Sequence, residues 1–217
     1  MLVLALDAST YAGSVALIRD GNVIGQTTVA MRGEHEERLM PAVAEILSTH
    51  GVEVDGLDAI ACGGGPGSFT SLRIAASIAK GLSAARQLPL VVAPSTLLAA
   101  AAAEPPLPAG KYVVALDAMR GDFFCQDVEV NTDGAIRPGD SRRTTRVDLE
   151  SHAAAQGSRI IGPAEPVPTT PHARGFAKLI SLGLAQPVEM TTWEPEYGRK
   201  AEAQVRWEVA HGRELGE

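Results

Sequence analysis

A run of glycines, from Gly63 to Ser68, lies between a predicted buried strand and a predicted helix. Such a loop can bind an anion, because free backbone N–H groups and the helix dipole point at the ligand. The run lacks the Lys of a P-loop and has Ser68 where a dinucleotide fingerprint needs its third Gly. An anion site and a tight turn with Ser68 as the helix N-cap therefore remain equally good interpretations.

Two aspartates each end a predicted buried strand, and Asp7 is followed by Ser9 and Thr10. A carboxylate in this place could hold Mg²⁺, and the two hydroxyls could donate hydrogen bonds to a phosphate. The alternative, favoured for Asp117 and left open for Asp7, is that each aspartate accepts hydrogen bonds from the turn after it. The candidate nucleotide or phosphate site consists of Asp7, Ser9, Thr10, Gly65, Gly67, Ser68 and Asp117.

Metal and protease chemistry find little support in the residue spacing. The segment that starts at His35 has Leu39 where a zincin helix has its second His, and no Ser lies in a Gly-x-Ser-x-Gly elbow. Cys62 and Cys125 fit neither a zinc site nor a disulfide framework, so we expect small buried thiols in a reduced, cytoplasmic compartment. We expect no metal and no cofactor.

Composition limits the classes of partner. The chain has 217 residues, 45% of them hydrophobic, and a net charge of −7. This is too apolar for a disordered chain, and no stretch is long enough to span a membrane or has the charge pattern of a signal peptide. Neither half is basic, and the one cluster, Arg142, Arg143 and Arg146, has acids around it. Tight independent binding to nucleic acid is therefore disfavoured.

Hydrophobic periodicity predicts alternating strands and helices. Asp20-Gly21 between two apolar runs predicts a hairpin. Pro41 should kink the first helix or mark an early turn, and Gly51 should cap its end. The predicted strands are residues 2–6, 14–19, 22–30, 57–62, 88–93, 112–118 and 123–130. The predicted helices are residues 35–50, 69–86, 95–103 and about 199–211.

The proline-rich segment 104–108 suggests a boundary between a first lobe (1–104) and a second lobe (105–217). The second half begins as the first does, since Ala5-Leu6-Asp7-Ala8 recurs as Ala115-Leu116-Asp117-Ala118. In both copies a short loop and another apolar run follow. This pattern favours a long-period duplication of a strand–Asp–turn–strand unit.

Several motifs together resemble the TsaB (YeaZ-type) family. They are Asp7-Ala8-Ser9-Thr10, the hairpin with Ser14-Val15-Ala16-Leu17, His35-x-x-x-Leu39-Met40-Pro41, the string from Gly65 to Arg73 (GPGSFTSLR) and Pro195-x-Tyr197. The resemblance covers residues 1–100 well and the rest loosely.

The resemblance implies a duplicated α/β fold of the actin-like, RNase-H-like kind (the sugar kinase/Hsp70 superfamily), with a reduced second lobe. It also implies a role in making N6-threonylcarbamoyladenosine at position 37 of tRNA. Family members assist a catalytic paralogue of the TsaD type and an ATPase of the TsaE type. Positions that hold the paralogue's metal ligands correspond here to Ser95 and Ala99, so the phosphate site is expected to be vestigial and the chain non-catalytic.

The resemblance further implies that the helices at 35–50 and 69–86 meet the same pair of helices in the paralogue. Small residues such as Ser77, Gly81 and Ala84 would permit close approach, and a homodimer is the expected substitute for the chain alone. Transfer RNA would be contacted only indirectly, and no membrane is involved. The expected interface residues are His35, Leu39, Met40, Val43, Leu47, Arg73, Ile74, Ser77, Lys80 and Gly81.

Two rival functions remain. A stand-alone ATPase or kinase of the same superfamily would use Asp7, Asp117 and the glycine loop, and would bind nucleotide with metal. A peptidase is weaker, because the sequence offers no identifiable nucleophile or metal pair.

Overall fold

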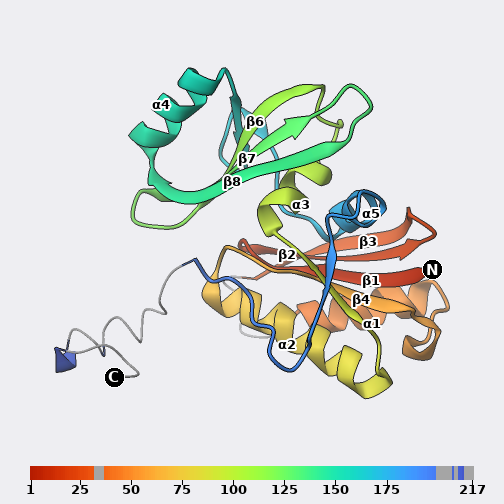
Figure 1. Ribbon diagram of the computed structural model, residues 1–217. Helices are drawn as coiled ribbons and strands as arrows, with labels where there is room; N and C mark the ends of the chain where they lie inside the picture. The colour runs from red at the N-terminus through yellow and green to blue at the C-terminus, as the bar shows by residue number, and fades with distance from the viewer. Residues whose placement is uncertain (32–36, 199–206, 208–209, 213–217) are drawn as a thin grey trace.

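Two β-sheets lie one above the other in the computed structural model, which describes residues 1–31, 37–198, 207 and 210–212 (Figure 1). The first sheet contains β1 (Leu2–Asp7), β2 (Ala12–Arg19), β3 (Asn22–Ala30), β4 (Ala59–Gly63), β5 (Leu90–Ala93) and β11 (Gln186–Val188). The second contains β6 (Gly110–Asp117), β7 (Asp122–Val130), β8 (Ile136–Thr145), β9 (Arg159–Gly162) and β10 (Val167–Pro168). The helices are α1 (Leu39–Thr49), α2 (Phe69–Arg86), α3 (Ser95–Ala101), α4 (Arg146–Gln156) and α5 (Phe176–Ser181), with 3₁₀ turns η1 (Val54–Gly56) and η2 (Ala173–Gly175).

The two sheets share one topology. In the first, β1 pairs antiparallel with β2 and parallel with β4, and in the second, β6 pairs antiparallel with β7 and parallel with β9. The strand orders are β11-β5-β4-β1-β2-β3 and β10-β9-β6-β7-β8. The predicted duplication is therefore confirmed, and the chain has the expected duplicated actin-like, RNase-H-like α/β fold.

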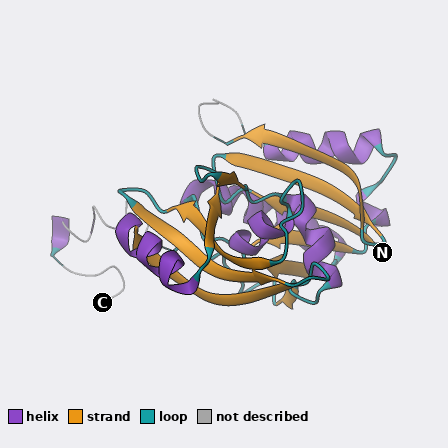
Figure 2. Ribbon diagram, turned by 90° about the horizontal axis from the view of Figure 1, so that it is seen from above, coloured by secondary structure: helices purple, strands orange, loops and turns teal. Residues whose placement is uncertain are grey.

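Helices and sheets alternate in layers, as the views in Figures 1 and 2 show. Side chains alternate between the faces of a strand, so Leu4 and Leu6 pack under α1 and α2, while Val3 and Ala5 face the central core with α3 and α5. The outer face of the second sheet is covered by α4, with Leu149 in its core. The order of layers is α1/α2, first sheet, α3/α5, second sheet, α4.

The second lobe is reduced where the first carries its longest helix. The 18-residue α2 joins β4 to β5, whereas a short turn of residues 163–166 joins β9 to β10. The second lobe therefore has a counterpart of α1, which is α4, but its β9–β10 connection is too short to contain a helix like α2.

The chain returns to the first sheet after β10. The sequence predicted one division at 104/105, yet β11 pairs antiparallel with β5 of the first sheet. The expected boundary separates the two sheets as far as β10, and the segment beyond it joins both lobes. None of the elements from β8 to β11 was predicted; in β8 and α4, exposed charged residues hide the apolar periodicity.

The first helix begins later than the sequence predicts, at Leu39. Pro41 lies in its first turn, where no intrahelical N–H is required, so it starts the helix and does not kink it. Gly51 has φ +61°, and its amide donates to the Ser48 carbonyl, which confirms the expected C-terminal cap. The helix expected at 199–211 falls mostly outside the described residues.

Candidate functional site

The turns that follow β1 and β6 face each other across a cleft of about 280 Å³ between the lobes. The first turn contributes Ser9 and Thr10, and the second contributes Asp117. Gly67 and Ser68 of the glycine loop complete this polar side of the cleft. Five residues of the candidate phosphate site are thus brought together, and the other two, Asp7 and Gly65, lie behind them in the protein interior.

Asp7 is fully buried and its carboxylate is turned toward the protein. One oxygen, Oδ1, accepts hydrogen bonds from the Ser9 backbone N–H (3.1 Å) and hydroxyl (2.9 Å). The other, Oδ2, accepts from the Ser95 hydroxyl (2.7 Å). Both oxygens of Asp7 thus have hydrogen-bond donors from Ser9 and Ser95, in the place where a bound metal ion would otherwise contact them. Burial raises the pKa of Asp7, although hydrogen bonds from Ser95 and Ser9 oppose the shift.

We expect Asp7→Asn to gain stability relative to the wild type as pH rises. A carboxyl whose pKa is raised by folding contributes stability below its unfolded pKa, and this contribution is lost as pH rises through the folded value. The amide stays neutral, and its NH₂ can donate to the Ser95 hydroxyl, which can also accept. Denaturant unfolding of both proteins, from pH 4 (near the ordinary pKa of 3.8) up to about pH 8, measures the difference. A difference that does not change with pH would contradict the assignment.

The glycine loop uses its amides within the protein. The N–H of Gly64 donates to the Ala93 carbonyl, that of Gly65 to the Ser95 hydroxyl, and that of Ser68 to the Ser9 carbonyl. The Ser68 side chain contacts the Ser71 hydroxyl and does not cap the helix. These three donors are not available for an anion. These contacts are typical of a tight turn, although the expected side-chain cap by Ser68 is not made.

Asp117 follows the same local rule as Asp7. Its Oδ1 accepts from the backbone N–H of Met119 (2.7 Å), two residues on, as Asp7 accepts from Ser9. The alternative favoured for Asp117, hydrogen bonding to its own turn, is what the geometry shows. Phe123 and Phe124 line the cleft beside it, together with the buried carboxylate of Glu165. The cleft combines apolar walls with two carboxylates, of which Glu165 is paired with Arg146.

The expected interface residues of α1 divide between two faces of the helix. Leu39 and Val43 are fully buried and Leu47 is nearly so, all of them against the outer face of the first sheet. Met40, in contrast, is 39% exposed. Leu39 and Val43 therefore belong to the core under α1, because the stripe at spacing four faces the sheet. His35 lies outside the described residues.

On α2 the expected residues lie mainly on the outer face. Ser77, Gly81 and Arg73 are exposed, whereas Ile74 and Lys80 are partly buried. A Cβ added at Gly81 would meet nothing within 4 Å. Two grooves lie along the pair of helices: one of about 470 Å³ includes Arg73, Ile74 and Ser77, and one of about 380 Å³ includes Met40 and Leu47.

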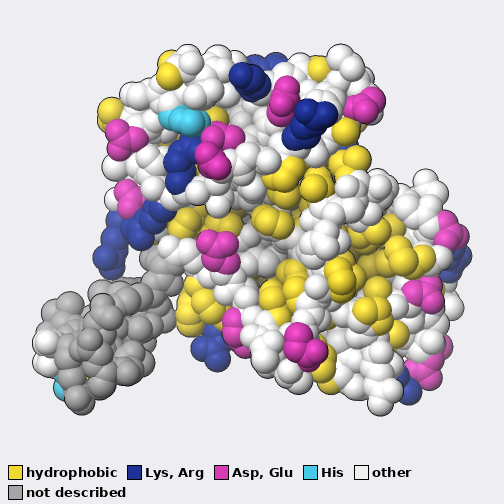
Figure 3. All heavy atoms as spheres, in the orientation of Figure 1, with side chains coloured by type: hydrophobic (Ala, Val, Ile, Leu, Met, Phe, Trp, Pro, Cys, Tyr) yellow, Lys and Arg dark blue, Asp and Glu magenta, His cyan; other side chains and the backbone are white. Residues whose placement is uncertain are grey.

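Several charged and C-terminal residues were not assigned to the site from the sequence. The segment 193–197 packs on α2 and the glycine loop, and Pro195-x-Tyr197 was its one sequence signal. Three arginines of β8 and α4 are paired with acids: Arg142 with Asp127 (2.9 Å), Arg143 with Asp122 (2.7 Å) and Arg146 with Glu150 (2.7 Å). On the face shown in Figure 3, basic and acidic side chains of the upper lobe are interspersed, and hydrophobic ones gather where the lobes meet.

Two searches of the described residues gave negative results. Within them, no three or more His, Cys, Asp or Glu residues form a group that could hold a metal ion. The described helices also include none that is long and apolar enough to cross a membrane.

Comparison with known proteins gives consistent relatives. A family model described as TsaD, tRNA N6-adenosine threonylcarbamoyltransferase, matches residues 28–140. The chain is 36% identical over 134 residues to the tRNA threonylcarbamoyladenosine biosynthesis protein TsaB of Escherichia coli, a match to 62% of this chain and 58% of that protein. The Haemophilus influenzae protein of the same name is 38% identical over 59% of this chain and 54% of its own length. The chain thus spans just over half the length of the curated relatives it matches.

A solved structure from Pseudomonas aeruginosa covers more of the molecule. It is described as an uncharacterized protein with similarity to peptidase YEAZ, and it is 30% identical with a TM-score of 0.74. The superposition covers 91% of this chain and 99% of that one. A second structure, YeaZ from the same organism, is 27% identical, also with a TM-score of 0.74, and covers 90% and 99% of the two chains.

Proposed function

Because the chain belongs to the TsaB (YeaZ-type) family, we propose that it is a non-catalytic subunit in the biosynthesis of tRNA N6-threonylcarbamoyladenosine at position 37. In this role it binds a catalytic paralogue of the TsaD type and thereby stabilises or activates it. Together with the paralogue it binds an ATPase of the TsaE type, and it contacts tRNA only indirectly. Alone it forms a homodimer through the same surface. Its compartment is the cytoplasm, and its two lobes divide between residues 104 and 105 as far as β10, beyond which β11 rejoins the first sheet.

The observation that carries this proposal is the open outer face of α2. Ser77 and Gly81 are exposed on it, with the exposed Met40 of α1 nearby. Small side chains allow the backbone of a partner helix to come close, and Met adapts its shape to an apolar partner surface. The α1/α2 face therefore supports helix-to-helix docking.

The interior of the cleft supports a non-catalytic role. Asp7 is satisfied by two serines, and three amides of the glycine loop are used within the protein. A phosphate that used these groups would first have to break the contacts that they make within the protein. A stand-alone ATPase therefore needs a rearranged cleft, whereas a docking subunit does not.

Size-exclusion chromatography of the chain mixed with its cognate paralogue tests the proposal. We expect a stable complex, and we expect calorimetry of the chain alone with Mg²⁺ and ATP to show no saturable binding at micromolar concentrations. The absence of a complex would contradict the docking role. Micromolar nucleotide binding that Asp7→Ala abolishes would favour the ATPase alternative.

A further inference from the structure

A short extended segment, residues 193–197, lies across α2, and we call it the strap. At one end, Lys80 of α2 forms an ion pair with Glu194 (2.8 Å) and lies over the ring of Trp193, 5.7 Å from its centroid. At the other end, Tyr197 packs on Phe69, with ring centroids 4.4 Å apart. The strap therefore runs antiparallel to α2, over about three turns of the helix.

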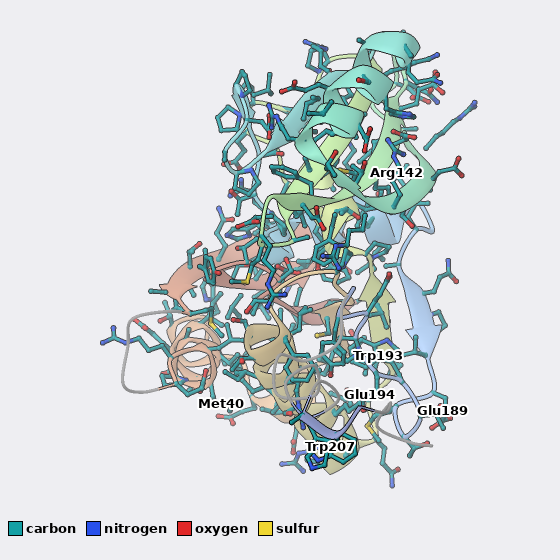
Figure 4. All side chains as sticks on the ribbon, turned by 90° about the vertical axis from the view of Figure 1, so that its left-hand side faces the viewer. Met40, Arg142, Glu189, Trp193, Glu194 and Trp207 are labelled. Atoms are coloured by element: carbon teal, nitrogen blue, oxygen red, sulfur yellow. The ribbon has the colours of Figure 1, made fainter. Side chains whose placement is uncertain are left out.

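The strap covers one edge of the outer face of α2. At 3.6 residues per turn, Phe69, Arg73 and Lys80 fall on one stripe of the helix. The stripe toward α1 contains Ile74, which lines a groove together with Glu37 from the segment before α1. Ser77 lies between the two stripes and is exposed. In Figure 4, Trp193 and Glu194 lie on one side of α2, and Met40 of α1 lies on the other.

The backbone of the strap is anchored, whereas the side chain of Glu194 is held weakly. Near Tyr197 the strap is anchored, because the Glu196 backbone N–H donates to the Gly64 carbonyl (2.8 Å) and the Glu196 carbonyl lies against Gly65. Near Trp193 the half-buried indole packs against the core beneath α1 and α2, and the Trp193 backbone N–H donates to the Glu189 carbonyl (2.9 Å), whereas the Glu194 side chain is 66% exposed in its ion pair with Lys80. Exposed ion pairs and cation–π contacts contribute little and exchange readily with other partners.

We propose that the Glu194 side chain of the strap is an autoinhibitory contact, which occupies Lys80 at the edge of α2 and is displaced when a partner helix docks there. This rests on the proposed function, because it assumes that α2 is the docking face. A helix is about 10 Å across with its side chains. A helix seated over Ser77 therefore reaches the Lys80 stripe on one side and α1 on the other. Glu194 and an acidic residue of the partner would then compete for the same ammonium group.

The test is the affinity of the full chain for its cognate paralogue, measured by calorimetry. We expect Glu194→Gln to bind about two- to fivefold more tightly than the wild type, because less binding energy is spent on displacing the ion pair. Glu196→Gln is the matched control. It removes the same charge from the strap, but the glycine-loop contacts of Glu196 are made by its backbone, so its affinity should equal that of the wild type.

A second measurement uses the chain alone. Acylation of the Lys80 amine, followed by mass spectrometry, should be faster in Glu194→Gln than in the wild type or in Glu196→Gln. Equal acylation rates, or paralogue binding that is unchanged or weaker in Glu194→Gln, would overturn the autoinhibitory contact alone. Failure of the wild-type chain to bind the paralogue would overturn the proposed function and the strap proposal with it.

Discussion

The double variant Met40→Asp/Gly81→Arg is expected to weaken binding of the catalytic paralogue by about 100-fold, roughly 3 kcal/mol. Gly81 is exposed in the middle of α2, and Met40 is exposed at the start of α1. An arginine at 81 would occupy the space that a partner backbone needs. An aspartate at 40 would place a charge where an apolar contact is expected. Calorimetry or quantitative co-purification with the paralogue measures the effect.

Neither change should impair the fold itself. A Cβ at Gly81 meets nothing within 4 Å, and arginine is a better helix former than glycine. An aspartate near a helix N-terminus interacts favourably with the helix dipole. The matched control is Val147→Asp/Ala155→Arg, which makes the same kinds of change at exposed positions of α4 on the other lobe. Undiminished binding by the α1/α2 variant, or equal loss in the control, would remove the α1/α2 face from the interface.

Gly65→Ala is expected to lower the free energy of unfolding by roughly 3–4 kcal/mol. Gly65 has φ +84°, a conformation that alanine adopts only with strain. A Cβ at this position would lie 2.1 Å from the backbone carbonyl oxygen of Glu196 and 3.1 Å from the Leu72 side chain. The glycine loop and the strap would have to separate, which also breaks the hydrogen bond from the Glu196 N–H to the Gly64 carbonyl. Denaturant unfolding followed by circular dichroism measures the loss.

Gly81→Ala provides the opposite expectation for the same chemical change. It lies inside a helix with open space around it, so alanine should stabilise the protein by about 0.5–1 kcal/mol. Comparable stability of the two variants would show that the glycine loop is not packed against the strap. Loss at Gly65 with a gain at Gly81 would support the close packing.

Much of the fold could be predicted because local signals and the repeat agreed. The recurrence of Ala-Leu-Asp-Ala at 5–8 and 115–118 marks equivalent strands, β1 and β6, and their aspartates make the same turn contact. Asp20-Gly21 predicted the β2–β3 hairpin, and both residues have positive φ as that turn requires. Such features depend on a few neighbouring residues, which is why a sequence alone reveals them.

Features that depend on distant residues were not predictable. The apolar periodicity of α1 marks its residues as amphipathic, but it cannot say that Leu39 and Val43 face a sheet while Met40 faces outward. Whether the Asp7 carboxylate binds a metal ion or accepts a hydrogen bond from a serine depends on Ser95, which is 88 positions away. The pairing of β11 with β5 and the position of the strap on α2 are likewise long-range contacts between short polar segments.

Reconstitution of threonylcarbamoyl transfer to tRNA most directly tests whether this chain acts through a partner. The reaction would contain threonylcarbamoyl-adenylate, the tRNA transcript, the catalytic paralogue and the small ATPase, with and without this chain. We expect modified tRNA when all three proteins are present, little when this chain is omitted, and none when it is the sole protein. Modification by this chain alone, or an equal yield in its absence, would contradict the account.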